Sequence, residues 1–384
     1  MWIKNGNVLT EDGTFEKKDI RIEDGRIAEI VGSDLGKSLD SETGYDATGC
    51  YVIPGLVDIH SHGCVDCDAC DASVEAIREM AKYEASVGVT TYVPTTMTYP
   101  EDRLISIAKA IREYRENENE EAGRAFIAGI NMEGPFISPA KVGAQNPKYV
   151  SRTDAGMFRR INEASGNAVL LCDIAPEEEG AIEFVKAVSD ETRISIAHTC
   201  ATYEEAALAY RSGAKHLTHM FNAMPPLSHR EPGPIAAAAE TDFVTAEIIC
   251  DGVHVYPPMV NMAYKVFGPE RLIMISDSMR ATGLPDGEYE LGGQPVTVRG
   301  NRATLHDGTI AGSATNLFDC MMNAVKTMGI PLAGAVRCAS ENPAKAIGMF
   351  DEVGSISVGK RADLVLVSED DLERCDVFVR GHRL

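Results

Sequence analysis

The central part of the chain alternates short apolar runs with longer amphipathic segments. Eight apolar runs of strand length end near the following residues: His60, Thr95, Glu133, Ala175, His198, His219, Cys250 and Asp277. Helix-length segments follow most of these runs, for example at 73–87, 101–116, 177–188 and 202–212. Apolar strands separated by helical segments are typical of βα units with parallel strands. Eight such units predict an α/β fold, namely a (β/α)8 barrel of the TIM type.

The two ends of the chain have a different, strand-like pattern. Residues 19–30 alternate apolar and polar positions around the turn dipeptide Asp24-Gly25, which indicates a β-hairpin. Further short strand-like runs are found at 46–53, 363–367 and 377–379. We therefore expect the two terminal segments to meet in a small β-sandwich domain.

This change of pattern predicts a division into two domains. Residues 1–54 and 350–384 are expected to form the small β-sandwich, and residues 55–349 are expected to form the catalytic barrel. A Gly-rich segment at 284–305 interrupts the barrel pattern after the eighth strand, and its turn dipeptides predict hairpins.

Composition and charge exclude several classes of protein. The 384-residue chain has a formal net charge of −22, which makes it a poor candidate for binding nucleic acid or an anionic membrane. No apolar run approaches the roughly 18 residues that a membrane span needs, and the N-terminus lacks a signal-peptide pattern. Ten cysteines in such a chain favour free thiols in a reducing compartment. We therefore expect a cytoplasmic protein.

Imidazole and carboxylate side chains gather where the predicted strands end. The carboxyl ends of barrel strands meet at one rim, which carries the active site. His60 and His62 lie two residues apart on a strand and therefore share a face. The other strand-end candidates are Glu133, His198, His219 and Asp277. One such residue alone is usually structural, but this combination predicts a site for Zn²⁺, Fe²⁺, Mn²⁺ or Co²⁺.

His216 provides an internal comparison for this prediction. It lies three residues before His219, so we expect it to face away from the barrel axis and to be structural.

Several motifs resemble a known family. The stretch from Pro54 to Gly63 is similar to the first-strand motif of the amidohydrolase superfamily. Longer stretches are similar to its N-acetylglucosamine-6-phosphate deacetylases, and they are 131–136, 141–147, 216–225, 230–233, 251–254, 275–277, 311–313 and 342–344. The resemblance spans essentially the whole chain, and the 216–225 block is its most specific part.

The resemblance implies a set of metal ligands. Glu133, His198 and His219 would hold the main ion, and His60 and His62 would hold a second ion with Glu133 as the bridge. Some family members lack the histidine pair and work with one ion, whereas this sequence keeps it. One or two divalent ions per subunit are therefore expected, with Zn²⁺ or Fe²⁺ ahead of Mn²⁺ or Co²⁺.

The resemblance also implies a reaction. Asp277 matches the catalytic aspartate, which would accept a proton from water and deliver one to the departing nitrogen. The expected reaction converts N-acetyl-D-glucosamine 6-phosphate to D-glucosamine 6-phosphate and acetate, in amino-sugar catabolism. Arg230 matches a phosphate-binding arginine, a role that suits the planar guanidinium. Further matches to substrate-contacting positions are Ala144, Asn222, Ala223, His254, Ile310, Ala311 and Gly312.

Two alternatives to this reaction stay open. An N-acetylgalactosamine-6-phosphate deacetylase would use the same metal ligands and the same Asp277, and the sequence separates the two epimers poorly. A non-catalytic barrel that serves as a scaffold would typically lose metal ligands that this chain keeps. The family further implies a homodimer in which the neighbouring subunit contributes to the phosphate site.

Two departures from the family pattern concern the surroundings of the site. Gln145 stands where some relatives have a histidine, which leaves one polar contact near the substrate open. The cysteines Cys64, Cys67 and Cys70 follow the first-strand motif, but an iron–sulfur cluster usually needs four ligands. We expect these three cysteines to be local substitutions.

Overall fold

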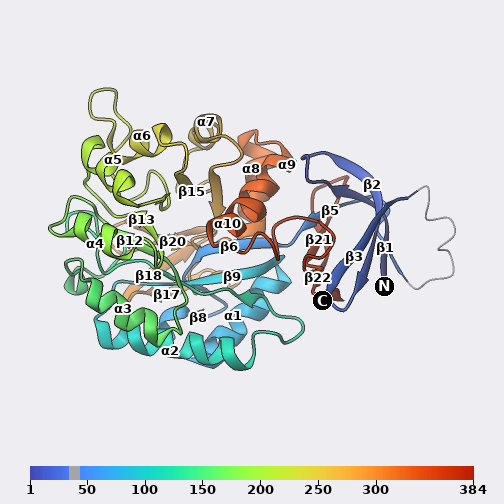
Figure 1. Cartoon of the computed structure of the whole chain (residues 1–384), viewed down its shortest axis with the longest axis horizontal. Helices are drawn as coiled ribbons and strands as arrows, with labels where there is room; N and C mark the ends of the chain where they lie inside the picture. Colours follow the sequence, from blue (N-terminus) through green and yellow to red (C-terminus); the bar gives the residue numbers. More distant parts are fainter. Residues whose placement is uncertain (34–43) are drawn as a thin grey trace.

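Eight parallel strands form the centre of the larger part of the molecule (Figure 1). The computed structural model describes residues 1–33 and 44–384. The barrel strands are β6 (Leu56–Ser61), β9 (Val89–Thr96), β11 (Ile130–Met132), β12 (Val169–Ile174), β13 (Arg193–Ile196), β14 (His216–Leu217), β15 (Thr245–Ile249) and β16 (Leu272–Ile275). Each strand ends within two residues of its predicted position. The prediction of a (β/α)8 barrel is therefore confirmed.

The barrel closes between its first and last strands at the carboxyl end. Among the described residues no strand ladder joins β16 to β6. Instead, the Asp277 amide donates a hydrogen bond to the His60 carbonyl over 2.9 Å, and the His62 amide donates one to Ser278 over 2.8 Å. The closing seam therefore runs through three residues that the sequence marks as candidates for the site.

Helices cover the outside of the barrel (Figure 1). They are α1 (Val74–Ser86), α2 (Glu101–Asn117), α3 (Ala155–Ala164), α4 (Ala181–Val188), α5 (Tyr203–Ser212), α6 (Gly233–Glu240), α7 (Pro257–Phe267), α8 (Leu317–Met328), α9 (Leu332–Val336) and α10 (Asn342–Ala346). Local capping explains where they begin. Thr202 accepts from the Glu205 amide and Glu205 accepts from the Thr202 amide, a capping box that starts α5. All residues of β6 and β9 are buried, as expected for strands covered on both faces.

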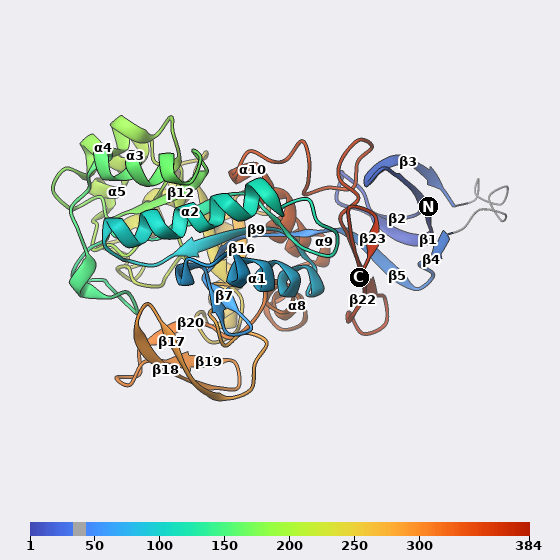
Figure 2. The same cartoon turned by 90° about the horizontal axis from the view of Figure 1, so that it is seen from below.

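Strands from both ends of the chain form a separate sheet. It contains β1 (Trp2–Leu9), β2 (Phe15–Glu23), β3 (Arg26–Gly32), β4 (Gly44–Asp46), β5 (Cys50–Pro54), β21 (Leu364–Ser368), β22 (Arg374–Val379) and β23 (His382–Arg383). Antiparallel pairing of β5 with β21 joins the two ends, and both termini lie in this part of the molecule (Figure 2). The prediction of a second β unit is confirmed, whereas its exact boundaries stay a prediction.

The predicted terminal hairpin is present. Glu23 pairs with Arg26 across the turn, and Asp24 and Gly25 have φ angles of 48° and 73°. Two consecutive positive φ angles are the signature of a type I′ turn, which asparagine, aspartate and glycine tolerate best.

A small antiparallel sheet follows β16 and projects from the barrel (Figure 2). It contains β17 (Gly287–Leu291), β18 (Gln294–Arg299), β19 (Arg302–Thr304) and β20 (Ile310–Ser313), so the predicted hairpins are confirmed. The Ser313 amide donates to the Asp277 carbonyl over 2.7 Å, which fastens β20 beside the closing seam.

In the described part of the chain, no helix combines the length and the apolarity that crossing a bilayer requires.

Candidate active site

Five buried side chains from the ends of four strands converge at the carboxyl end of the barrel. Glu133 follows β11, His198 follows β13 and His219 follows β14. The Nε2 atoms of His198 and His219 each lie 3.1 Å from Glu133 Oε1 and 3.1 Å from one another. These three side chains form one group that could hold a metal ion.

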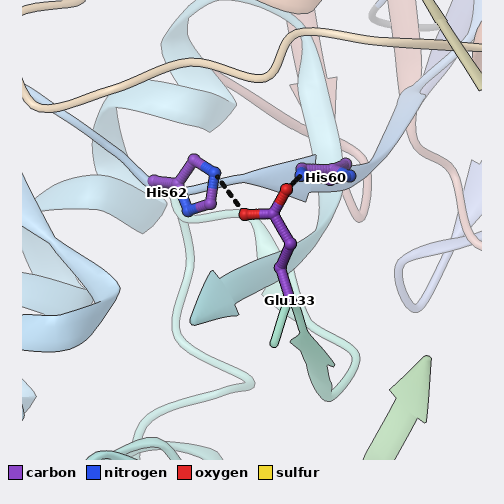
Figure 3. A group of neighbouring side chains, drawn as sticks. All are labelled: His60, His62 and Glu133. Atoms are coloured by element: carbon purple, nitrogen blue, oxygen red, sulfur yellow. Dashed lines mark ion pairs between the residues drawn. The ribbon is translucent and has the colours of Figure 1, made fainter. Parts of the chain in front are cut away.

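His60 of β6 and His62, which directly follows β6, form a second group on the other side of Glu133. His60 Nε2 lies 3.5 Å from Glu133 Oε1, and His62 Nε2 lies 3.3 Å from Glu133 Oε2. Figure 3 shows the two carboxylate oxygens of Glu133 directed at the two rings. Glu133 therefore belongs to both candidate metal groups, as a bridging ligand would.

In two of these rings, His198 and His62, the Nδ1 atom that faces away from Glu133 is held by a backbone carbonyl, which bears on metal binding. His198 Nδ1 lies 2.8 Å from the Lys141 carbonyl, and His62 Nδ1 lies 3.3 Å from the Thr95 carbonyl. A carbonyl only accepts, so Nδ1 carries a proton in each ring, and the lone pair available to a metal ion is the one on Nε2. These lone pairs face Glu133, so the donor set fits a divalent ion of the Zn²⁺ or Fe²⁺ type.

The carboxyl group of Asp277 lies beside the second group. Its Oδ1 atom is 3.3 Å from His62 Nε2 and 3.7 Å from His60 Nε2. Burial raises the pKa of this carboxyl, but the two neighbouring imidazoles outweigh that effect and lower it. Asp277 is therefore ionised near neutral pH and able to accept a proton.

Three of these residues have unusual backbone conformations. His198, His219 and Asp277 have φ angles of 42°, 28° and 49°. Non-glycine residues rarely adopt positive φ, and such positions cluster at functional sites because the surrounding structure must hold them. The strained turns after the strands direct all three side chains toward the same place.

A cavity of about 240 Å³ opens onto these groups. Its walls include the following predicted site residues: His62, Glu133, Ala144, His198, His219, Asn222, Ala223, His254, Asp277, Ile310 and Gly312. The fully buried His60 and Ala311 are not part of the wall. The cavity wall thus combines residues from the barrel rim and from β20.

Arg230 lies apart from this cavity. It is exposed on the loop before α6 and lines a second cavity of about 530 Å³ together with Tyr203, Glu231 and Glu240. Within one subunit the structure therefore does not bring Arg230 to the candidate metal ligands.

Two residues outside the predicted set support the cavity wall. Asp251 accepts from His254 Nδ1 over 2.7 Å and from the His254 amide over 2.9 Å, which directs His254 Nε2 away from Asp251. Gln145 is buried, accepts from the Thr98 amide over 2.7 Å and donates to Glu133. Both lie in stretches that resemble the deacetylase family, 141–147 and 251–254. The sequence therefore marked their positions but not their hydrogen-bond partners.

The three cysteines after the first strand do not contribute to a metal group among the described residues. Cys64 and Cys67 pair across a two-residue hairpin formed by β7 (Gly63–Cys64) and β8 (Cys67–Asp68). The Cys70 sulfur accepts from the Met97 amide over 3.2 Å. Burial raises the pKa of the Cys64 and Cys70 thiols, so both are protonated at neutral pH.

Comparisons with known proteins agree with this geometry. The sequence pattern of the amidohydrolase family matches residues 51–384. An N-acetylglucosamine-6-phosphate deacetylase of Bacillus subtilis is 36% identical over 98% of this chain and 94% of its own length. An N-acetylgalactosamine-6-phosphate deacetylase of Escherichia coli O157:H7 is 30% identical over 97% of this chain and 96% of its own length.

A solved structure shares the whole architecture. N-acetyl-D-glucosamine-6-phosphate deacetylase from Mycobacterium smegmatis superposes with a TM-score of 0.91 at 32% identity, covering 100% of both chains. The family match spans most of the chain, and the Bacillus subtilis relative spans 98% of it. The chain therefore belongs to the amidohydrolase family, as its first-strand motif predicted.

Proposed function

We propose that this chain hydrolyses the acetamide group of N-acetyl-D-glucosamine 6-phosphate, giving D-glucosamine 6-phosphate and acetate. The observation that carries the proposal is the pair of candidate metal groups that share Glu133 beside the Asp277 carboxyl, in the wall of one cavity. The names of the Bacillus subtilis and Mycobacterium smegmatis relatives support this choice of substrate.

We propose Zn²⁺ or Fe²⁺ as the metal, with Mn²⁺ and Co²⁺ as weaker candidates, and one or two ions per subunit. Glu133, His198 and His219 would hold the first ion, and His60 and His62 would share Glu133 to hold the second. A bound divalent ion would lower the pKa of a water molecule and polarise the acetyl carbonyl.

Asp277 would act as general base and then as general acid. Its ionised carboxyl lies at the cavity wall, where it can accept the proton of the attacking water. The same carboxyl would then deliver a proton to the sugar nitrogen, which makes the amine a better leaving group.

The remaining wall residues would bind the sugar. His254 presents Nε2 to the cavity because Asp251 holds Nδ1. Asn222, Ala223 and Ala144 would offer amide groups and backbone. Ile310 and Gly312 of β20 would line the opposite side, with the buried Ala311 between them.

We propose that the phosphate is bound by Arg230 of a second copy of the chain. Arg230 is exposed and lies in its own cavity, which supports a role outside its own subunit. The functional unit would then be a homodimer.

We place the protein in the cytoplasm, and the free thiols of all ten cysteines support a reducing compartment.

The proposal is tested by acetate release from the 6-phosphates of N-acetylglucosamine and N-acetylgalactosamine, with both unphosphorylated sugars as controls. We expect the gluco phosphate to have the highest kcat/KM. A higher kcat/KM for the galacto phosphate would instead identify the activity named for the Escherichia coli relative. Equal rates with and without phosphate would contradict the role of Arg230.

A further inference from the structure

A buried carboxylate on β15 connects the candidate metal ligands to the interior of the barrel. Glu247 has no exposed surface and is not part of either candidate metal group. Its Oε2 atom lies 2.9 Å from His60 Nδ1 and 3.1 Å from the His219 amide, and its Oε1 atom lies 2.9 Å from His216 Nε2. Three N–H donors therefore meet on one carboxylate.

The direction of the hydrogen bonds behind Glu247 follows from the outermost residue. Arg193 can only donate, and its guanidinium lies 3.2 Å from the Thr245 hydroxyl oxygen. The Thr245 hydroxyl, 2.6 Å from His216 Nδ1, is therefore free to donate its own proton to that nitrogen. The proton of neutral His216 then resides on Nε2 and is donated to Glu247. This chain of bonds explains why His216 is buried next to the site without being a ligand.

On the other side of Glu247 the same reasoning applies to His60. A carboxylate only accepts, so His60 donates its Nδ1 proton to Glu247 and keeps the lone pair on Nε2. Among the described residues His60 Nε2 has no hydrogen-bond partner, and it lies 3.5 Å from Glu133. Glu247 thus selects the tautomer and the ring orientation that a metal ligand needs.

The two candidate metal groups depend on Glu247 to different degrees. In the Glu133, His198 and His219 group, Glu247 contacts only the His219 backbone, and the Lys141 carbonyl orients His198. In the His60, His62 and Glu133 group, Glu247 holds a ligand ring directly.

We propose that Glu247 is a positioning residue that determines whether the second metal position is filled. The inference rests on the metal-dependent function proposed above and extends it to a residue outside the ligand set. Carboxylates that orient a ligand histidine typically change metal affinity by about 10-fold to 100-fold when replaced. We expect this loss at the second ion only.

The test is a two-step titration of chelator-treated protein with Co²⁺ alone, followed by calorimetry and by the visible spectrum of each bound ion. Wild-type protein is expected to bind two ions. In Glu247→Gln, one accepting oxygen replaces two, so the second Kd should rise about 10-fold or more while the first stays within about twofold. An unchanged Kd for the first ion would show that the variant is folded. A general loss of structure would weaken both ions and can therefore be recognised.

Asp173→Asn is the matched control. Asp173 is also a fully buried barrel carboxylate, but it accepts from the Thr218 hydroxyl over 2.9 Å rather than from a metal-group ring. The Asp173→Asn variant should therefore have the same Kd as wild type for both ions. Should Glu247→Gln not fold, His216→Asn removes a donor from Glu247 and should weaken the second ion by a smaller factor.

Three results would overturn the inference: an unchanged second Kd in Glu247→Gln, equal weakening of both ions, or a wild type that binds one ion at saturation. These results differ from failure of the proposed function itself. In that case the wild type would bind no ion and release no acetate from the 6-phosphate.

Discussion

The backbone at Asp277 links the chemistry of the site to the closure of the barrel. Its amide donates to the His60 carbonyl, its carbonyl accepts from the Ser313 amide, and its side chain lies beside His62. Asp277 makes all of these contacts with a positive φ of 49°. The sequence marked Asp277 by its position after a strand, but these contacts follow from the closed barrel.

Replacing Asp277 separates proton transfer from metal binding. Asp277→Asn keeps the volume and backbone of the residue and removes the basic oxygen, so kcat should fall by about 10²-fold to 10⁴-fold. Metal content, measured by elemental analysis, should stay at the wild-type value because neither candidate metal group includes Asp277. Full retention of kcat would contradict the proposed proton transfer.

The Asp251–His254 pair permits a second test, which concerns the orientation of a substrate-binding residue. Asp251→Asn exchanges an acceptor for an amide that cannot satisfy all three His254 and Val253 donors, so His254 should lose its orientation. We expect KM to rise by about 10-fold, as for the loss of one good hydrogen bond to substrate. His254→Asn should have a similar effect, and the double variant should be no worse than either single one. Additive losses would show that the two residues act independently.

Antiparallel pairing of the strands β5 and β21 brings the two ends of the chain together. Asp363, immediately before β21, stabilises the adjoining turn because its carboxyl accepts from the Arg380 amide over 2.7 Å and its carbonyl accepts from the Gly55 amide over 2.8 Å. Burial raises the pKa of the Asp363 carboxyl from 3.8 to about 6, against the opposing effect of the Arg380 amide and nearby arginines.

The raised pKa of Asp363 predicts a pH dependence of stability. In the folded protein the carboxyl keeps its proton up to about pH 6, whereas in the unfolded chain it loses it near pH 4. Its contribution to stability is therefore present below pH 4 and is lost as the pH rises through 6. Two pKa units correspond to about 3 kcal/mol.

Asp363→Asn should remove this dependence because the amide oxygen can still accept from Arg380 without a charge. Urea midpoints measured from pH 4 to pH 8 should therefore fall less for the variant than for wild type. Asp307→Asn, at an exposed loop position, is the control and should not reproduce the change. Parallel curves for wild type and Asp363→Asn would show that the carboxyl does not titrate in this range.

In the molecule as a whole, Arg230 lies too far from the candidate metal ligands for one subunit to supply both to the same cavity. The metal candidates come from strands around the barrel and meet in one cavity, whereas Arg230 lies in another. The phosphate site that we propose, completed by a second copy, would reconcile the two locations, and a symmetric dimer is the commonest assembly that would supply it.

Mixing two inactive variants tests this arrangement. Asp277→Asn supplies an intact Arg230, and Arg230→Ala supplies an intact Asp277, so a mixed dimer should contain one complete site. Co-refolded in equal amounts, the two should regain about a quarter of the wild-type activity, because half the dimers are mixed and each has one working site. If the mixture is only as active as the two variants measured separately and added together, a shared site is contradicted. Sedimentation should show whether dimers form in the mixture.

The alternation of apolar and polar positions was enough to predict the eight barrel strands, the terminal hairpin at Asp24-Gly25 and the residues that end the strands. These features are local, because side-chain alternation and turn chemistry act over a few residues. The family resemblance predicted Glu133 as the shared ligand and a contribution from a neighbouring subunit. The hydrogen bond from His60 to Glu247 and the location of Arg230 in another cavity became visible with the folded chain. Those contacts join residues that are distant in the chain, and their geometry depends on how the barrel closes at the Asp277–His60 seam.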